Sequence, residues 1–164
     1  LIDHPSDPGG ITNFGISLRA LQLLGDRGFD LDGDGVLDAD DIRAFTRDRA
    51  IEFYRRHYWF DRLDHVKQQQ LATKIFDMAV NMGRARATSI TQRAIAWFDP
   101  SIRIDGQFGP VTLASLNGQA AMHGTKVLKA IQAEQARFYV DLVAANRARD
   151  VFLLGWLRRA FDIV

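Results

Sequence analysis

The sequence lacks cysteine, and it has only two glutamates among its 164 residues. The absence of cysteine excludes disulfide scaffolds, cysteine-based zinc sites and thiol nucleophiles. The sequence also has no uninterrupted apolar run near the roughly 20 residues that span a bilayer, so we expect no stable membrane insertion. The hydrophobic residues that are present, 47% of the total, suffice for one good core and a small appended lobe.

Both glutamates lie in stretches predicted to be helical, and each is followed by arginine within four residues. Glu52 is followed by Arg55 and Arg56, three and four residues later, and Glu134 is followed by Arg137, three residues later. Ion pairs form on a helix surface at these spacings. We interpret both glutamates as surface groups, and neither is a persuasive general acid.

The charges are unevenly divided along the chain. Residues 1–64 carry 13 acidic and 8 basic side chains, a net charge of −5, whereas residues 65–164 carry 7 acidic and 13 basic ones, a net charge of +6. A basic half can face an anionic polymer such as cell wall or nucleic acid. The Lys and Arg residues are scattered rather than massed, however, which favours solvated helix faces, and we expect no nucleic-acid partner.

Most of the chain has the apolar spacing of helices. The spacing predicts helices over residues 17–24, 48–58, 70–82, 84–97, 125–148 and 151–161, with another helix beginning near Asp40. Strands are predicted only at residues 11–16 and in the segment before them, and together these would form a small hairpin. The sequence therefore predicts a mainly α fold with a small N-terminal β-hairpin.

The N-terminal segment combines a sharp turn with polar side chains. Residues 8–10 are Pro-Gly-Gly, which favours a turn, and they are flanked by Asp7, Thr12 and Asn13. A catalytic loop needs this combination of turned backbone and polar groups. A surface hairpin built from common turn residues is the alternative.

Residues 30–41 fit the twelve-residue calcium loop of an EF-hand. The predicted ligands are the carboxylates of Asp30, Asp32, Asp34 and Asp41 and the backbone carbonyl of Val36. The last position is Asp41 rather than the usual Glu, whose arm is longer. Without a cation these carboxylates would repel one another, which makes a plain acidic turn a poor interpretation. A flexible all-oxygen loop suits calcium better than magnesium, and a single loop favours a structural ion over a sensor.

Two further motifs lie in the helical part of the sequence. Asp77 and Asn81 are four residues apart and share a helix face, where they could bind sugar hydroxyls or hold a neighbouring loop. Asp105-Gly106 is typical of a turn, and Pro110 suits the first position of a helix. This second motif is either scaffold or a place where a helix N-terminus receives a polar group of a ligand.

Taken together, the motifs resemble those of the lysozyme-like N-acetylmuramidases of glycoside hydrolase family 108, which include phage endolysins and secretion activators. The matching segments, in the expected order, are residues 7–16, 77–83, 105–112 and 152–157. The third of these is similar to the core motif of type 3 peptidoglycan-binding regions. The resemblance implies a lysozyme-like orthogonal helical fold and hydrolysis of the β-1,4 bond between N-acetylmuramic acid and N-acetylglucosamine.

The resemblance also implies roles for individual residues. The family motif is preceded by Glu-Gly-Gly, whose Glu is the catalytic acid, and this places the Glu just upstream of Leu1. Asp7 and Thr12 would then assist catalysis, and Asn13, Asp77 and Asn81 would contact the substrate. We expect a muramidase region at residues 1–72 and a peptidoglycan-binding-like helical region at residues 73–164, packed as one compact unit.

The expected partner is peptidoglycan, and the expected state is a monomer made in a bacterial cytoplasm that acts in the periplasm or at the cell wall. A noncatalytic, calcium-stabilised peptidoglycan-binding protein is the main alternative, and it would lack the upstream Glu. A calcium-responsive regulator would need an apolar groove that opens with calcium, and the single loop disfavours it.

Overall fold

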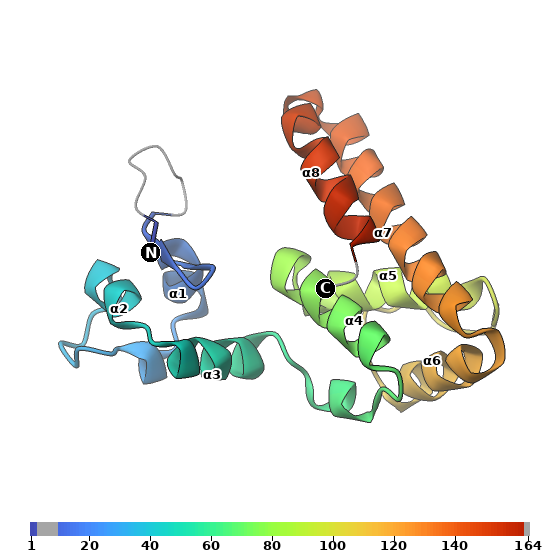
Figure 1. Cartoon of the computed structure of the whole chain (residues 1–164), viewed down its shortest axis with the longest axis horizontal. Helices are drawn as coiled ribbons and strands as arrows, with labels where there is room; N and C mark the ends of the chain where they lie inside the picture. The colour runs from blue at the N-terminus through green and yellow to red at the C-terminus, as the bar shows by residue number, and fades with distance from the viewer. Residues whose placement is uncertain (3–9, 163–164) are drawn as a thin grey trace. The chain divides into compact units, whose positions relative to one another are not determined.

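The computed structural model describes residues 1–2 and 10–162. The chain divides into two compact units, which we call the N-terminal unit (residues 1–57) and the C-terminal unit (residues 58–164). About 70% of the residues are helical. Helices make up most of the ribbon in Figure 1. None of the described helices is both long and apolar enough to cross a membrane.

The N-terminal unit begins with a small hairpin that leads directly into a helix. Strands β1 (Thr12–Asn13) and β2 (Ile16–Ser17) pair antiparallel, and Ile2 forms a bridge to Thr12. The two residues at the tip, Phe14 and Gly15, both have positive φ, the conformation that a tight two-residue hairpin turn requires. Ser17 then caps α1 (Leu18–Leu24), because its Oγ accepts from the N–H of Ala20 at 3.2 Å.

The rest of this unit encloses an aromatic core. It contains η1 (Arg27–Phe29), α2 (Ala39–Ala44) and α3 (Arg47–His57). Phe29 stacks on Phe45, with ring centroids 5.8 Å apart, and meets Phe53 edge to face at 5.0 Å. All three rings are buried, so η1 and the two ends of the segment 45–53 are fixed to one another through aromatic packing.

The C-terminal unit is built only from helices in its described part. Its elements are η2 (Asp61–His65), α4 (Gln69–Met82), α5 (Arg84–Ala96), α6 (Pro110–His123), α7 (Thr125–Ala145), η3 (Arg147–Arg149) and α8 (Asp150–Phe161). Helix α5 packs against both α4 and α7, and α8 lies along α7 (Figure 1). Fully buried apolar side chains fill the centre, among them Ile75, Met78, Ile95, Leu116 and Ile131.

The predicted mainly helical class with an N-terminal hairpin is confirmed. Most predicted helices match the observed ones within a residue or two at each end, and α6 does begin at Pro110. The exception is residues 125–148, predicted as one helix. Helix α7 ends at Ala145, because Asn146 leaves the helical conformation and its side chain accepts from the N–H of Ala148.

One burial prediction is wrong. Glu52 is a surface group, as expected, and pairs with Arg49 and Arg56. Glu134, in contrast, is only 5% exposed, and it accepts a hydrogen bond from Nε1 of Trp97 at 2.9 Å. Glu134 is buried because it faces the end of α5, where Trp97 lies. The spacing of charged residues along α7 alone does not reveal this contact between two helices.

Candidate functional site

The hairpin of the N-terminal unit holds two of the predicted site residues, Thr12 and Asn13. Asp7 lies outside the described residues. Thr12 is half-buried on β1, and its Oγ1 donates to the carbonyl of Gly10 at 3.3 Å. Nδ2 of Asn13 donates to the carbonyls of Ile42 and Phe45, at 3.0 and 3.3 Å. Asn13 therefore ties the hairpin to the end of α2, whose last carbonyls have no partner within the helix.

The tip of the hairpin is also anchored. The hydroxyl of Tyr54 donates to the carbonyl of Phe14 at 3.0 Å. A Cβ at Gly15 would lie 2.7 Å from that hydroxyl, and the φ of Gly15 is +77°. Both facts require glycine at the tip. The contacts of Asn13 and Tyr54 thus present Thr12 on a short, fixed strand.

The acidic loop brings three of its four predicted carboxylates together. Asp30, Asp32 and Asp41 each offer an oxygen, and these oxygens lie within 4.8 Å of one another. Asp41 is completely buried and accepts the backbone N–H of Asp38, while Asp30 accepts those of Gly33 and Gly35. The loop is therefore folded around its carboxylates rather than extended.

The donor set of this loop fits a hard cation. Its oxygens are carboxylates of the kind that calcium prefers. The Asp34 N–H that donates to Asp32 lowers the pKa of Asp32, but desolvation and the carboxylates of Asp34, Asp41 and Asp30 outweigh it, so this pKa is raised overall. Asp34 does not belong to the group of three; its Oδ1 accepts the N–H of Val36 at 2.7 Å.

Asp77 and Asn81 lie on α4 in the C-terminal unit. Asp77 is 8% exposed, and its Oδ1 accepts from Nη2 and Nε of Arg159 on α8, at 2.7 and 3.2 Å. Nδ2 of Asn81 donates to the carbonyl of Asp77 at 2.7 Å. Asp77 therefore holds a neighbouring element, the structural role considered from sequence, and the sugar contacts of both residues stay predictions.

The Asp105 motif is organised by one buried amide on α5. Oε1 of Gln92 accepts the N–H groups of Asp105 and Gly106, at 3.1 and 2.9 Å. Nε2 of Gln92 donates to Oδ1 of Asp105 at 2.9 Å and to Oγ1 of Thr112 at 3.1 Å. Hydrogen bonds from Gln92 and from the N–H of Gln107 lower the pKa of Asp105. The motif is thus a scaffold that joins the loop to α5 and α6.

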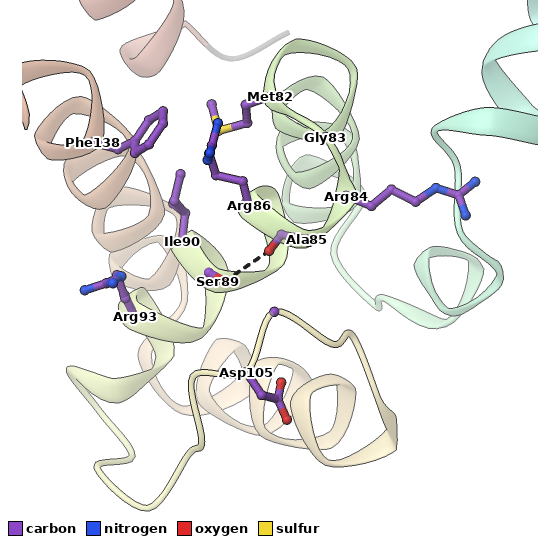
Figure 2. A pocket seen from close by; sticks show the side chains of 11 residues that line it. Met82, Gly83, Arg84, Ala85, Arg86, Ser89, Ile90, Arg93, Asp105 and Phe138 are labelled. Atoms are coloured by element: carbon purple, nitrogen blue, oxygen red, sulfur yellow. Dashed lines mark hydrogen bonds between the residues drawn. The ribbon is translucent and has the colours of Figure 1, made fainter. Parts of the chain in front are cut away.

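Next to this scaffold lies a groove of about 600 Å³, shown in Figure 2. Its lining includes Arg86, Ser89, Ile90 and Arg93 of α5, Gly106 of the loop and Phe138 of α7. The loop approaches α5 closely: a Cβ at Gly106 would lie 3.1 Å from both the carbonyl oxygen of Ala85 and Oγ of Ser89. We call this feature the α5 groove.

Two family models match the chain in sequence. The model for glycosyl hydrolase 108 matches residues 1–83, about half of the chain, and the model described as a predicted peptidoglycan domain matches residues 86–161. This chain belongs to the glycosyl hydrolase 108 family. The resemblance inferred from the motifs is confirmed, with both regions in the expected order.

A solved structure supports the assignment. The structure of Brucella abortus SagA has 26% sequence identity to this glycosyl hydrolase 108 chain and a TM-score of 0.70, and the match covers 97% of this chain and 80% of SagA. The mainly helical architecture is consistent with a lysozyme-like fold. A comparison with curated proteins returns no match.

Membership in the glycosyl hydrolase 108 family supports a glycoside hydrolase. The two matched regions support a peptidoglycan hydrolase or peptidoglycan-binding protein of a bacterial or phage family that acts on the cell wall. The matched regions meet between residues 83 and 86, whereas the compact units meet between residues 57 and 58. The boundary expected between residues 72 and 73 stays a prediction.

Sequence reasoning missed the α5 groove. Arg86 and Arg93 are seven residues apart and therefore share one face of a helix, which is a signal that the sequence does contain. The opposite wall comes from Phe138, 45 to 52 residues further along the chain. Only the packing of α5 against α7 brings these side chains together.

Proposed function

We propose that this protein is an N-acetylmuramidase that hydrolyses the β-1,4 bond between N-acetylmuramic acid and N-acetylglucosamine. The observation that carries the proposal is the glycosyl hydrolase 108 match over residues 1–83, followed directly by the peptidoglycan-domain match. We place its action in the periplasm or at the cell wall, where this polymer lies.

The general acid in this proposal is a glutamate encoded just before Leu1. Neither glutamate of the chain suits the role, because Glu52 is held between two arginines and Glu134 is buried against Trp97. The upstream Glu would protonate the leaving glycosidic oxygen, and Asp7 or Thr12 would position water or stabilise the transition state. Asn13, Asp77 and Asn81 are the proposed substrate contacts.

We further propose that calcium occupies the loop at residues 30–41 as a structural ion. Asp30, Asp32 and Asp41 would hold it, with Asp34 and the carbonyl of Val36 as the remaining proposed ligands. Support comes from the convergence of three carboxylates. The ion would neutralise their mutual repulsion and so fix the loop that connects η1 with α2.

The activity is tested with the chain extended by the encoded residues that precede Leu1. Purified peptidoglycan is digested, reduced with borohydride and analysed by mass spectrometry. We expect products whose reduced ends are muramic acid, and we expect the upstream Glu→Gln variant to lose activity by about 100-fold or more.

Other outcomes identify other functions. Reduced ends of glucosamine would contradict the assigned bond while keeping a glycosidase. Binding of peptidoglycan without any products, in both the wild type and the variant, would establish the noncatalytic alternative. An encoded upstream sequence without Glu would contradict the proposed general acid.

A further inference from the structure

The α5 groove has the size and composition of a ligand site. Its volume of about 600 Å³ lies within the range of small-ligand pockets. Figure 2 shows Arg86 beside Met82 and Phe138 at one end, Arg93 at the other end, and Ile90 and Ser89 between them. The groove therefore combines an apolar wall with two guanidinium groups.

These two arginines are available to a ligand. Within the described residues, neither Arg86 nor Arg93 forms an ion pair or a side-chain hydrogen bond, although Cζ of Arg86 lies 5.1 Å from the centroid of the Phe138 ring. The third arginine at the groove, Arg84, donates to the carbonyl of Trp59 and points away from the other two (Figure 2).

The acidic groups nearby do not neutralise them. Asp105 is the one carboxylate among the described residues that line the groove, against the arginines 84, 86 and 93, and it is hydrogen-bonded to Gln92 and to the N–H of Gln107. Arg93 and Phe138 also line an adjoining pocket, which contains Glu134. The carboxylate of Glu134 accepts a hydrogen bond from Nε1 of Trp97 at 2.9 Å. Asp141 of that pocket lies 3.9 Å from Nε of Arg137. The groove itself thus has an excess of positive charge.

We propose that the α5 groove binds the peptide stem of peptidoglycan through the carboxylates of that peptide. The inference rests on the proposed function, because it assumes that peptidoglycan is the partner. The glycan repeat itself carries no charge once its lactyl group is joined to the peptide, so the free carboxylates lie on the peptide. Arginine is well suited to carboxylates, since its planar fork can donate two parallel hydrogen bonds.

The spacing of the arginines fits a peptide better than a single small anion. Seven residues along a helix correspond to about 10 Å, so Arg86 and Arg93 start from points two helical turns apart. Two carboxylates separated by several bonds within one peptide match this arrangement. Between them, Ile90 and Phe138 provide apolar surface for the methyl groups of alanine residues in the stem.

The test measures binding of the full chain to purified peptidoglycan by cosedimentation. Intact material is compared with material whose carboxylates have been converted to amides with a carbodiimide and ammonia, which removes the negative charges and keeps the cross-linked polymer insoluble. We expect the chain to bind the intact form at least about 10-fold more tightly. Arg86→Gln and Arg93→Gln should each weaken binding to the intact form by about 5- to 10-fold, the loss of one charge-assisted contact.

Arg158→Gln is the matched control. Arg158 is exposed on α8 and is not among the residues that line the groove, and its replacement removes the same charge. It should leave binding unchanged. Because all three arginines are exposed, the variants should keep the wild-type melting temperature, and a circular dichroism melt checks this.

Three outcomes would overturn the proposal. Equal binding to intact and amidated material would exclude the peptide carboxylates as the ligand but leave the proposed hydrolase intact. Displacement by polyglutamate as effectively as by the free stem peptide would show a general anion surface. Binding to neither form would contradict the proposed function as well, and this distinguishes the two failures.

Discussion

Gln92 is a single side chain that joins three separate segments of the C-terminal unit. Its side chain is 1% exposed. The amide oxygen accepts hydrogen bonds from the N–H groups of residues 105 and 106, and the amide nitrogen donates to the carboxylate of Asp105 and the hydroxyl of Thr112. A buried polar network of this kind is stable only while every member keeps its partner. The Asp105 motif owes its shape to this one residue.

Replacing Gln92 should therefore destabilise the protein strongly. For Gln92→Ala we expect a loss of about 2–4 kcal/mol in the free energy of unfolding, because a cavity forms in place of a buried side chain and two partly buried N–H groups lose their acceptor. Urea denaturation followed by circular dichroism measures it. Gln70→Ala, at an exposed position of α4, is the control and should change stability by less than about 0.5 kcal/mol. An equal effect of both substitutions would contradict the scaffold role.

At this scale, sequence reasoning succeeded where the partner was local. The arginine four residues after Glu52 predicted its ion pair, and Arg56 does form it. Glu134 has a similar neighbour in Arg137, yet its closest partner is Trp97, 37 residues away in the chain. Burial of Glu134 depends on how α5 and α7 pack, which local spacing does not encode.

Among the elements, the acidic loop is the one whose stability we expect to depend on a ligand. If calcium binds there, a free concentration 100 times the dissociation constant should stabilise the folded unit by about 2.7 kcal/mol. The melting temperature should rise with calcium and fall with a chelator. Magnesium at the same concentration should have a smaller effect, because it does not readily give up its water.

Asp30→Asn should abolish the response of the melting temperature to calcium. Asp48→Asn is a matched control, since Asp48 lies exposed on α3 outside the loop, and it should keep the response. If calcium does not change the melting temperature of the wild-type protein, the proposal of a structural calcium ion is wrong.

The helices themselves could be predicted well because their signals are local. Apolar spacing marked their buried faces, and Ser17 and Pro110 marked starts that the structure confirms. The end of α7 was missed because Asn146 has no strong stop signal beside it in sequence. Its cap forms only with the short η3 that follows.

For the molecule as a whole, two aspartates of the C-terminal unit should make stability depend on acid pH. Hydrogen bonds from Ser101 and Ser115 lower the pKa of Asp99, and those from Gln92 and Gln107 lower the pKa of Asp105. A carboxyl whose pKa is lower in the folded state stabilises that state above its unfolded pKa, near 3.8. The contribution is lost as the pH falls through the folded pKa.

We therefore expect the urea midpoint to fall as the pH is lowered from about 5 towards 2. Ser115→Ala removes one of the hydrogen bonds to Asp99, at 2.8 Å, and should make this fall smaller. Measuring the midpoint across this pH range for both proteins checks it. A fall that is the same in the variant would exclude the Ser115 hydrogen bond as a cause.

The candidate sites differ in how far the sequence could define them. The acidic loop is contiguous, so its residues could be identified by spacing alone, and three of its carboxylates do converge. Thr12 and Asn13 could be placed on a hairpin for the same reason. The α5 groove is assembled from α5, α7 and the loop at residue 106, and no single stretch of sequence contains it.

The loop approaches α5 closely at the edge of the groove because residue 106 is a glycine and has no side chain. Gly106 has a φ of +72°, and an added methyl group would meet both Ala85 and Ser89 at 3.1 Å. Alanine at this position would require the loop or α5 to shift by a few tenths of an ångström, although no arginine of the groove is replaced. One wall of the groove thus depends on a glycine, a residue with no side chain that could bind a carboxylate.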